Sequence, residues 1–212
     1  MQNRKQPTPD NGPKEPNIRT GGQDVCHWSA QGSFTGPLRA LLHPPARLLG
    51  SWVRPGMTAL DLGCGLGHFS LGMARLVGAG GRVAAVDLQQ GALDEVARRA
   101  ERAGLAGVVR THRCEAGTLG ELPRADFALA FWMVHETPDV GAFFRQVAAL
   151  LHPGGRLLFA EPPLHVSRGT FEEEVRLAQG AGLTLEARPR MALCRTALLR
   201  LDGQVGERIE ED

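Results

Sequence analysis

The sequence predicts an α/β fold in which helices cover both faces of a mostly parallel sheet. Short apolar segments alternate with segments of helical length through most of the chain, a pattern typical of such sheets. The last two apolar segments have no helix between them, so we expect an antiparallel hairpin at the end of the sheet. A glycine-rich turn follows the first apolar segment, and ligands of open α/β sheets bind at such strand ends.

Seven strands are expected, each an apolar or β-branched run bounded by turn residues. The parallel strands are predicted at residues 57–62, 82–87, 108–113, 126–131 and 155–161, and the hairpin at 183–188 and 193–201. Pro153, Gly154 and Gly155 predict a tight turn into the fifth strand.

Helices are expected near residues 68–77, 90–103, 139–150 and 169–180. The second shows Ala92, Val96, Ala100 and Ala103 at the spacing of one helix face. Gly104 and Gly182 indicate helix ends. A further helix is predicted to start at Pro44 or Pro45, which suit a first turn, and to carry Leu48, Leu49 and Trp52.

The chain of 212 residues is long enough for one substantial core. We expect a disordered tail at 1–24, an N-terminal lid loop and helix at 25–56, one domain at 57–202 and an acidic tail at 203–212. The net charge of +1 gives no general attraction for nucleic acid, and no apolar run approaches membrane-spanning length. Four scattered cysteines without a C-x-x-C pair favour reduced thiols in the cytoplasm, and we expect a monomer or homodimer.

The glycine-rich turn lies in Leu60–Phe69, which reads as a strand ending in a carboxylate, a G-x-G-x-G turn and a helix start. Glycine permits the backbone angles of such a turn and lets a ligand approach the main chain. Dinucleotide sites usually read G-x-G-x-x-G, whereas His68 takes the place of the late glycine here. Asp61 would repel a pyrophosphate but would attract the cationic ammonium and sulfonium of S-adenosylmethionine.

A second carboxylate, Asp87, ends the next strand about twenty residues after the glycines. Its two oxygens can accept hydrogen bonds from a pair of ribose hydroxyls. The alternative role of Asp87 is to cap the helix that follows.

Successive motifs at residues 60–69, 83–89, 113–116, 126–137 and 151–162 resemble those of class I S-adenosylmethionine-dependent methyltransferases. Within that class the chain is similar to the small-molecule group of the ubiquinone/menaquinone-biosynthesis type (methyltransferase type 11), over about residues 45–200. "LDLGCGLG" and "LHPGGRLLFAEP" are its most specific pieces. The resemblance implies a three-layer, Rossmann-like sheet of seven strands with one reversed.

The resemblance also implies a cofactor site at the strand ends. Its expected residues are Asp61, Gly63, Cys64, Gly65, Gly67, Asp87, Leu88, Glu115, Ala116 and Phe131. Glu115 matches the position of an acid that meets the adenine amino group, where family members more often carry Asp. The alternative is a solvated surface glutamate.

The fourth strand runs into Trp132-Met133-Val134-His135-Glu136, where a methyl acceptor should meet the sulfonium. If the acceptor is a phenol, enol, thiol or amine, a proton must leave, and histidine suits this near neutral pH. His135 is therefore the candidate general base, with Glu136 as its orienting partner or a substrate contact. The alternative is a structural cap that positions the following helix.

Substrate contacts are expected from Trp28, Phe34, Trp132, Glu161 and His165. Trp28 and Phe34 could form a lid over the pocket or a satellite cluster on the 44–52 helix. Glu161 could face the substrate or pair with an arginine. The seven histidines and four cysteines show no metal-ligand spacing, so no metal is expected.

These observations predict a methyltransferase that acts on a small molecule. An RNA or protein methyltransferase is the first alternative, although a basic groove and an Asn/Asp-Pro-Pro-Tyr motif are absent from the sequence pattern. A non-catalytic S-adenosylmethionine-binding module is the second, and a nicotinamide-dependent enzyme is the third.

Overall fold

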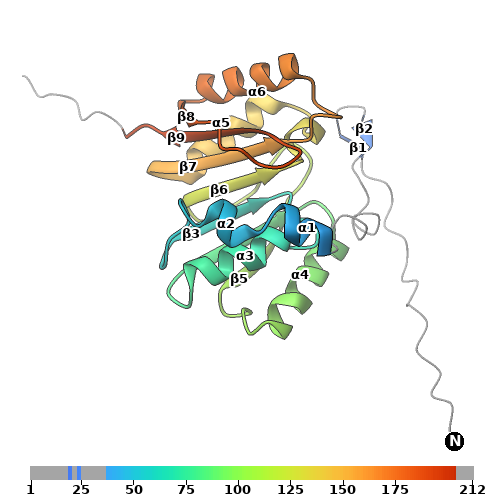
Figure 1. The fold of residues 1–212 in the computed structure, drawn as a ribbon, viewed down its shortest axis with the longest axis vertical. Coiled ribbons are helices and arrows are strands. Elements are labelled where there is room, and N and C mark those ends of the chain that lie inside the picture. The colour runs from blue at the N-terminus through green and yellow to red at the C-terminus, as the bar shows by residue number, and fades with distance from the viewer. Residues whose placement is uncertain (1–18, 21–22, 25–36, 204–212) are drawn as a thin grey trace, which may run out of the picture.

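A seven-stranded sheet forms the centre of the computed structural model, which describes residues 19–20, 23–24 and 37–203 (Figure 1). Its strand order is β5-β4-β3-β6-β7-β9-β8. The strands are β3 (Thr58–Leu62), β4 (Arg82–Asp87), β5 (Val109–Arg113), β6 (Ala125–Phe131), β7 (Leu151–Glu161), β8 (Leu183–Ala187) and β9 (Arg195–Leu201). The first five pair in parallel and β9 runs antiparallel to β7 and β8, which confirms the predicted sheet and its C-terminal hairpin.

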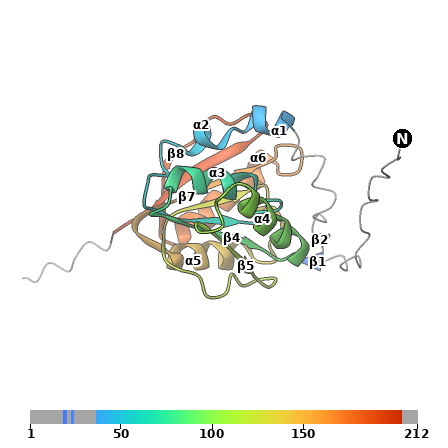
Figure 2. The same cartoon turned by 90° about the horizontal axis from the view of Figure 1, so that it is seen from below.

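Helices cover both faces of this sheet. They are α1 (Pro37–Leu42), α2 (Pro45–Leu49), α3 (His68–Val77), α4 (Gln90–Arg102), α5 (Val140–Leu150) and α6 (Arg168–Gly180), with a 3₁₀ turn, η2, at Val134–Glu136. Residues of α2, α3 and α4 pack on one face, and residues of α5 and α6 pack on the other. Figure 2 shows the sheet between these two layers.

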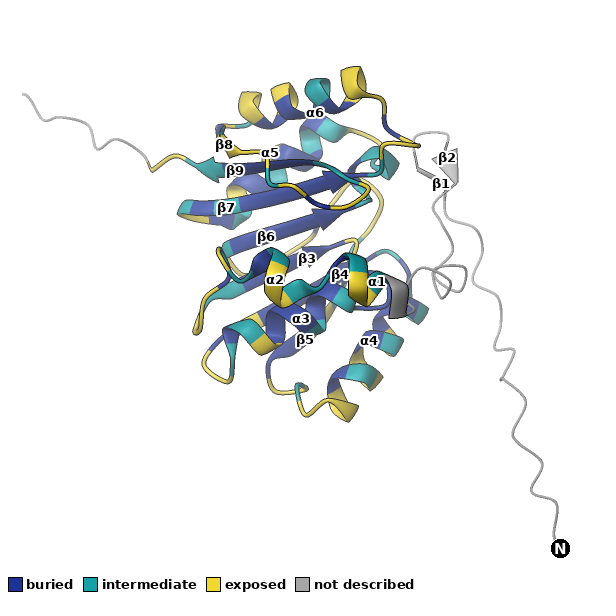
Figure 3. Cartoon of the chain, viewed as in Figure 1, coloured by how far each residue is buried: buried dark blue, intermediate teal, exposed yellow. Residues whose placement is uncertain are grey.

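Strand alternation decides which side chains meet which helical layer. Phe127 and Leu129 of β6 face the α3 side, whereas Ala128 and Ala130 face the α5 side. Because both faces of the central strands are covered, they read as continuous apolar runs in the sequence. Figure 3 shows this burial, with the central strands dark blue and exposed positions on the outer faces of α4 and α6.

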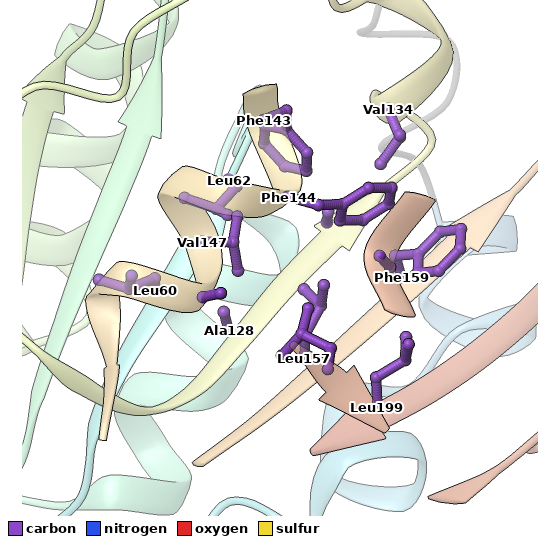
Figure 4. Close-up of a cluster of buried hydrophobic side chains, with 14 of the residues drawn as sticks. Leu60, Leu62, Ala128, Val134, Phe143, Phe144, Val147, Leu157, Phe159 and Leu199 are labelled. Carbon is purple, nitrogen blue, oxygen red and sulfur yellow. The ribbon is translucent and has the colours of Figure 1, made fainter. Parts of the chain in front are cut away.

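Aromatic side chains fill the core on the α5 and α6 side. Phe144 of α5 lies 5.3 Å from Phe159 of β7, and Phe159 lies 5.0 Å from Phe171 of α6, measured between ring centroids. Figure 4 shows Phe144 and Phe159 beside Leu157 and Leu199 of the neighbouring strands. Full burial of such aromatic side chains fixes how α5 and α6 sit on the sheet.

The structure differs from the sequence-based expectation in the fifth parallel strand. β7 begins at Leu151, because that residue already pairs with Ala125. The register then shifts, since Phe127 pairs with Arg156, so Pro153–Gly155 bulge from a strand rather than form a turn before it.

The N-terminal part also differs in detail. α2 ends at Leu49, so Trp52 lies beyond the helix but still packs against the same core. A separate helix, α1, precedes it, and β1 (Arg19–Thr20) and β2 (Gln23–Asp24) form a short antiparallel ladder. No helix among the described residues is long and apolar enough to cross a membrane.

Because α2 packs closely on α3, we expect replacement of Gly72 by alanine to destabilise the protein. A Cβ at Gly72 of α3 would lie 2.2 Å from Pro45 Cβ. We expect Gly72→Ala to lower the free energy of unfolding by about 1–3 kcal/mol because the rigid proline ring must move. In Gly180→Ala, a matched helical control with open space around the new Cβ, we expect no loss. Urea unfolding of both variants measures the difference, and equal stability would contradict this packing.

Candidate active site

A cavity of about 480 Å³ opens at the carboxyl ends of the parallel strands. The chain runs outward from β3 through β4 to β5 and then returns to β6 on the other side of β3. This reversal leaves a crevice beside the ends of β3 and β6, where open α/β sheets bind ligands. The volume is that of a small-molecule or cofactor site.

The structure places thirteen of the sequence-predicted site residues around this cavity. They are Asp61, Gly63, Cys64, Gly65, Asp87, Leu88, Glu115, Ala116, Phe131, Trp132, His135, Glu136 and His165. Gly67 and Glu161 belong to the same loops and strand ends but do not line the cavity. Trp28 and Phe34 lie outside the described residues.

The glycine turn after β3 lies against the neighbouring loops with little room. Gly63 has a φ of +67°, and a Cβ there would lie 2.8 Å from Met133 Cβ. Gly67 has a φ of +78° and caps α3 in a left-handed conformation, close to Val96 of α4. The two glycines therefore let the turn pack closely on Met133 and Val96, while Gly63 and Gly65 line the cavity.

Asp87 holds the glycine turn from the adjacent strand. Its carboxylate accepts hydrogen bonds from the backbone N–H of Gly65 at 2.9 Å and of Gln89 at 3.0 Å. Gln89, rather than Asp87, occupies the N-cap position of α4. The side chain thus links the turn to β4 and lines the cavity, and it is not the N-cap of α4.

Asp61 is a buried carboxylate at the end of β3. It accepts a hydrogen bond from Ser70 Oγ of α3 at 2.5 Å. Burial raises the pKa of Asp61 to about 6 from its ordinary value of 3.8; the Ser70 hydrogen bond and the Arg39 charge oppose this shift, and the Asp87 charge adds to it.

This shift predicts how the stability of an Asp61 variant changes with pH. Because the folded state holds the Asp61 proton more tightly, the wild type loses stability as the pH rises from 3.8 to about 6. Asn does not titrate, so Asp61→Asn should gain about 3 kcal/mol relative to the wild type across this window. Urea unfolding at several pH values tests it, and a relative loss with rising pH would contradict the buried carboxylate.

Arg39 of α1 is a cavity residue that the sequence did not indicate. Its guanidinium lies over the rings of Phe69, Phe131 and Trp132, with Cζ 5.7, 5.1 and 5.2 Å from their centroids. Its buried Nε has no hydrogen-bond partner among the described residues. A cation held by aromatic faces with a vacant donor is suited to bind an anionic ligand group.

Trp132 takes a conformation that is uncommon for its residue type. Its φ is +61°, and its backbone N–H donates to Ala160 O at 2.8 Å. Its indole Nε1–H donates to Cys194 Sγ at 3.3 Å, so the ring is held between β6 and the segment before β9. A non-glycine residue keeps a positive φ only where its surroundings enforce the strain. Such residues are common at functional sites.

His135 and Glu161 form a hydrogen-bonded pair behind the cavity wall. His135 Nδ1 lies 2.5 Å from Glu161 Oε2, and Glu161 Oε1 accepts from the backbone N–H groups of Val134 and His135. Glu161 is fully buried, whereas His135 is 17% exposed and lines the cavity. Glu161 thus faces the histidine and not the cavity, and it is the carboxylate that orients the ring, a role expected of Glu136.

The charge environment of His135 favours its protonated form. Burial alone lowers the pKa of His135, but the hydrogen bond and charge of Glu161, with the charges of Glu136 and Glu174, raise it above the ordinary 6.5. The helix that follows is capped by Asp139, whose carboxylate accepts from the Ala142 N–H at 2.8 Å. His135 is therefore not needed as the helix cap.

The fold and the site define a Rossmann-like protein with a nucleoside-type cofactor cavity. Residues 59–155 match the family described as a methyltransferase domain (Methyltransf_25). The ribosomal protein L11 methyltransferase of Pelotomaculum thermopropionicum is 35% identical over 144 residues, 66% of this chain and 42% of that one. The ubiquinone biosynthesis O-methyltransferase of Xanthomonas axonopodis pv. citri is 31% identical over 134 residues, 63% of this chain and 54% of that one.

The chain thus spans about half the length of these curated relatives. A solved S-adenosylmethionine-dependent methyltransferase from Aquifex aeolicus superposes with a TM-score of 0.75 at 21% identity, over 84% of this chain and all of that one. This likeness shows the fold. Residues 59–155 are thus a methyltransferase domain, and the fold is that of S-adenosylmethionine-dependent methyltransferases.

Proposed function

We propose that the protein transfers a methyl group from S-adenosylmethionine to a small-molecule acceptor that must lose a proton. The observation that carries this proposal is the His135–Glu161 pair at the cavity wall. Glu161 occupies Nδ1, so Nε2 is the nitrogen left for the cavity side. A cavity histidine with a buried carboxylate behind it has the arrangement of a general base.

The cavity residues suit the chemical groups of the cofactor. Asp61 would attract its cationic ammonium or sulfonium, and Asp87 would accept from its ribose hydroxyls. The absence of a Cβ at Gly63 makes room for Met133, which lies on the same cavity wall. Arg39, with its unpartnered Nε, would hold the cofactor's carboxylate.

The other predicted cofactor residues, except Gly67, line the same cavity. Cys64, Gly65 and Gly67 continue the turn, Leu88 follows Asp87, and Phe131 ends β6. Glu115 and Ala116 follow β5 and are exposed cavity-lining residues. We assign the adenine to this side, with Glu115 at its amino group.

The reaction needs alignment and the removal of one proton. When bound, S-adenosylmethionine supplies an electrophilic methyl group. His135 Nε2 takes the proton from the acceptor's O–H, S–H or N–H group, and Glu161 stabilises the imidazolium that forms. Trp132, Glu136 and His165 surround this position and would contact the acceptor, while Glu161 acts only through His135.

A protein acceptor is the second candidate. It is favoured by the similarity to a ribosomal protein L11 methyltransferase. It is disfavoured by the near-neutral chain and by the apolar lining of the cavity, which includes Phe143, Leu119 and Leu193.

The three cysteines within the described residues are free thiols, which supports a reducing compartment such as the cytoplasm.

The formation of S-adenosylhomocysteine with a panel of acceptors tests the proposal. The panel contains phenols, thiols and amines of matched size, together with O-methylated phenols as controls that lack a removable proton. We expect turnover with at least one protic group and none with the blocked controls. Turnover only with peptides or RNA would overturn the small-molecule assignment.

A further inference from the structure

A glutamate lies in the core-facing stripe of α6, where an apolar residue is the norm. The buried residues of this helix are Phe171, Glu174, Val175 and Ala178, at the spacing of one helix face. Glu174 is 3% exposed, and its Oε2 is fully buried without a hydrogen-bond partner among the described residues. A buried carboxylate of this kind is costly unless it carries a proton or serves a nearby positive charge.

The neighbouring glutamates of the same helix do not share this position. Glu172 pairs with Arg188 at 2.7 Å and Glu173 pairs with Arg176, both at the surface. The placement of Glu174 is therefore not a general property of this acidic stretch.

Glu174 lies on the side of the sheet to which Glu161 points. Leu157 and Phe159 of β7 face the α5 and α6 layer, and alternation puts Glu161 on the same face. The charges of Glu174 and Glu161 act on each other, and both act on His135. The three side chains thus form a series that runs from α6 through β7 to the cavity wall.

The two carboxyl groups of this series are not equivalent. Glu161 accepts hydrogen bonds from three donors, which are the backbone N–H groups of Val134 and His135 and the His135 ring. Glu174 has no such donors, and burial followed by the charge of Glu161 raises its pKa to about 7, with the His135 charge opposing. Glu174 therefore keeps its proton to a higher pH than a surface glutamate does.

Other charged groups near this series are engaged elsewhere or lie on the cavity side. Arg195 is opposite Glu161 in the β7–β9 register, but its Nε donates to Val166 O at 3.2 Å. Glu136 adds negative charge at His135, and the His165 ring lies 5.9 Å from the His135 ring.

We propose that Glu174 is a positioning residue that acts through Glu161 to set how tightly His135 holds a proton, an inference that rests on the proposed role of His135. With Glu174 neutral, one negative charge lies behind the imidazole. When Glu174 is ionised, a second negative charge stabilises the imidazolium. The pair thus strengthens His135 as a base as the pH passes neutrality.

The test is an NMR titration of ¹⁵N-labelled histidine in the full-length, ligand-free protein. His135 is assigned by the resonance missing from His135→Gln. We expect Glu174→Gln to lower the pKa of His135 by about half a unit or more, because the second negative charge is gone. Glu173→Gln, a control on the same helix whose carboxylate pairs with Arg176, should leave the pKa of His135 unchanged. An unchanged pKa in folded Glu174→Gln would overturn the proposal.

Two further measurements keep the proposal separable from folding and from the proposed function. Glu174→Met fills the site with an apolar side chain, so it should be as stable as the wild type and show the same lower pKa. With a working acceptor, the pH at which methyl transfer reaches half its maximum should fall in both variants. A lowered His135 pKa without any methyl transfer would contradict the proposed function but not the coupling.

Discussion

Replacing His135 with glutamine is expected to lower the rate constant of methyl transfer by about 10²- to 10⁴-fold, the usual contribution of a positioned general base. Affinity for S-adenosylmethionine should change little, because the cofactor groups are assigned to residues at the ends of β3, β4 and β5. The rate is measured as S-adenosylhomocysteine formed at saturating cofactor, and the affinity by calorimetry.

The general-base role of His135 also predicts how the wild-type rate changes with pH. His135 acts as a base only when neutral, so activity should rise with pH through a midpoint above 6.5, the ordinary histidine value. Glu161→Gln removes the carboxylate behind the ring and should lower both the rate and that midpoint. His152→Gln, an exposed histidine in the β7 bulge, is the matched control. A His135→Gln enzyme with wild-type turnover would exclude the base.

Replacing Asp87 with alanine is expected to weaken S-adenosylmethionine binding by about 10- to 100-fold, or about 1.4–2.8 kcal/mol. Two effects add. The variant loses the carboxylate assigned to the ribose, and it frees the Gly65 N–H that fixes the glycine turn. Calorimetric titration with the cofactor measures the loss.

Two variants distinguish these effects. Asp87→Asn keeps an oxygen that can accept from Gly65 N–H, so it should bind more tightly than Asp87→Ala but less tightly than the wild type. Asp94→Asn changes an exposed carboxylate of α4 and should bind like the wild type. Equal affinity in all four proteins would show that Asp87 does not contact the cofactor.

Much of this fold was predictable because its signals are local. The apolar runs that became β3, β4 and β6 are buried on both faces, and Gly104 and Gly182 take positive φ beyond α4 and α6 as expected. The extra length of β7 was not predictable in this way. Pairing of Leu151 with Ala125 depends on a neighbouring strand, which overrides the turn preference of Pro153 and Gly154.

The site residues likewise fall into those with a local sequence signal and those that only the fold brings together. The glycine turn and Asp87 carry their signal in sequence spacing. The partner of His135 does not, because Glu161 comes from β7, 26 residues later, and only the sheet places the two together. Nothing in the apolar segment Leu38–Leu42 marks Arg39 as a site residue. The aromatic rings around its guanidinium come from α3, the end of β6 and Trp132, which only the fold brings together. Glu174 could have been found as the lone charge in the buried stripe of α6.

We propose above that the transferred methyl group goes to a small molecule. It is tested most directly by incubating the protein with S-adenosylmethionine labelled in the methyl group and a cell extract, and then separating small molecules from macromolecules by ultrafiltration. We expect His135-dependent label in the small-molecule fraction, with His135→Gln as the blank. Label that appears only in protein or RNA would contradict it.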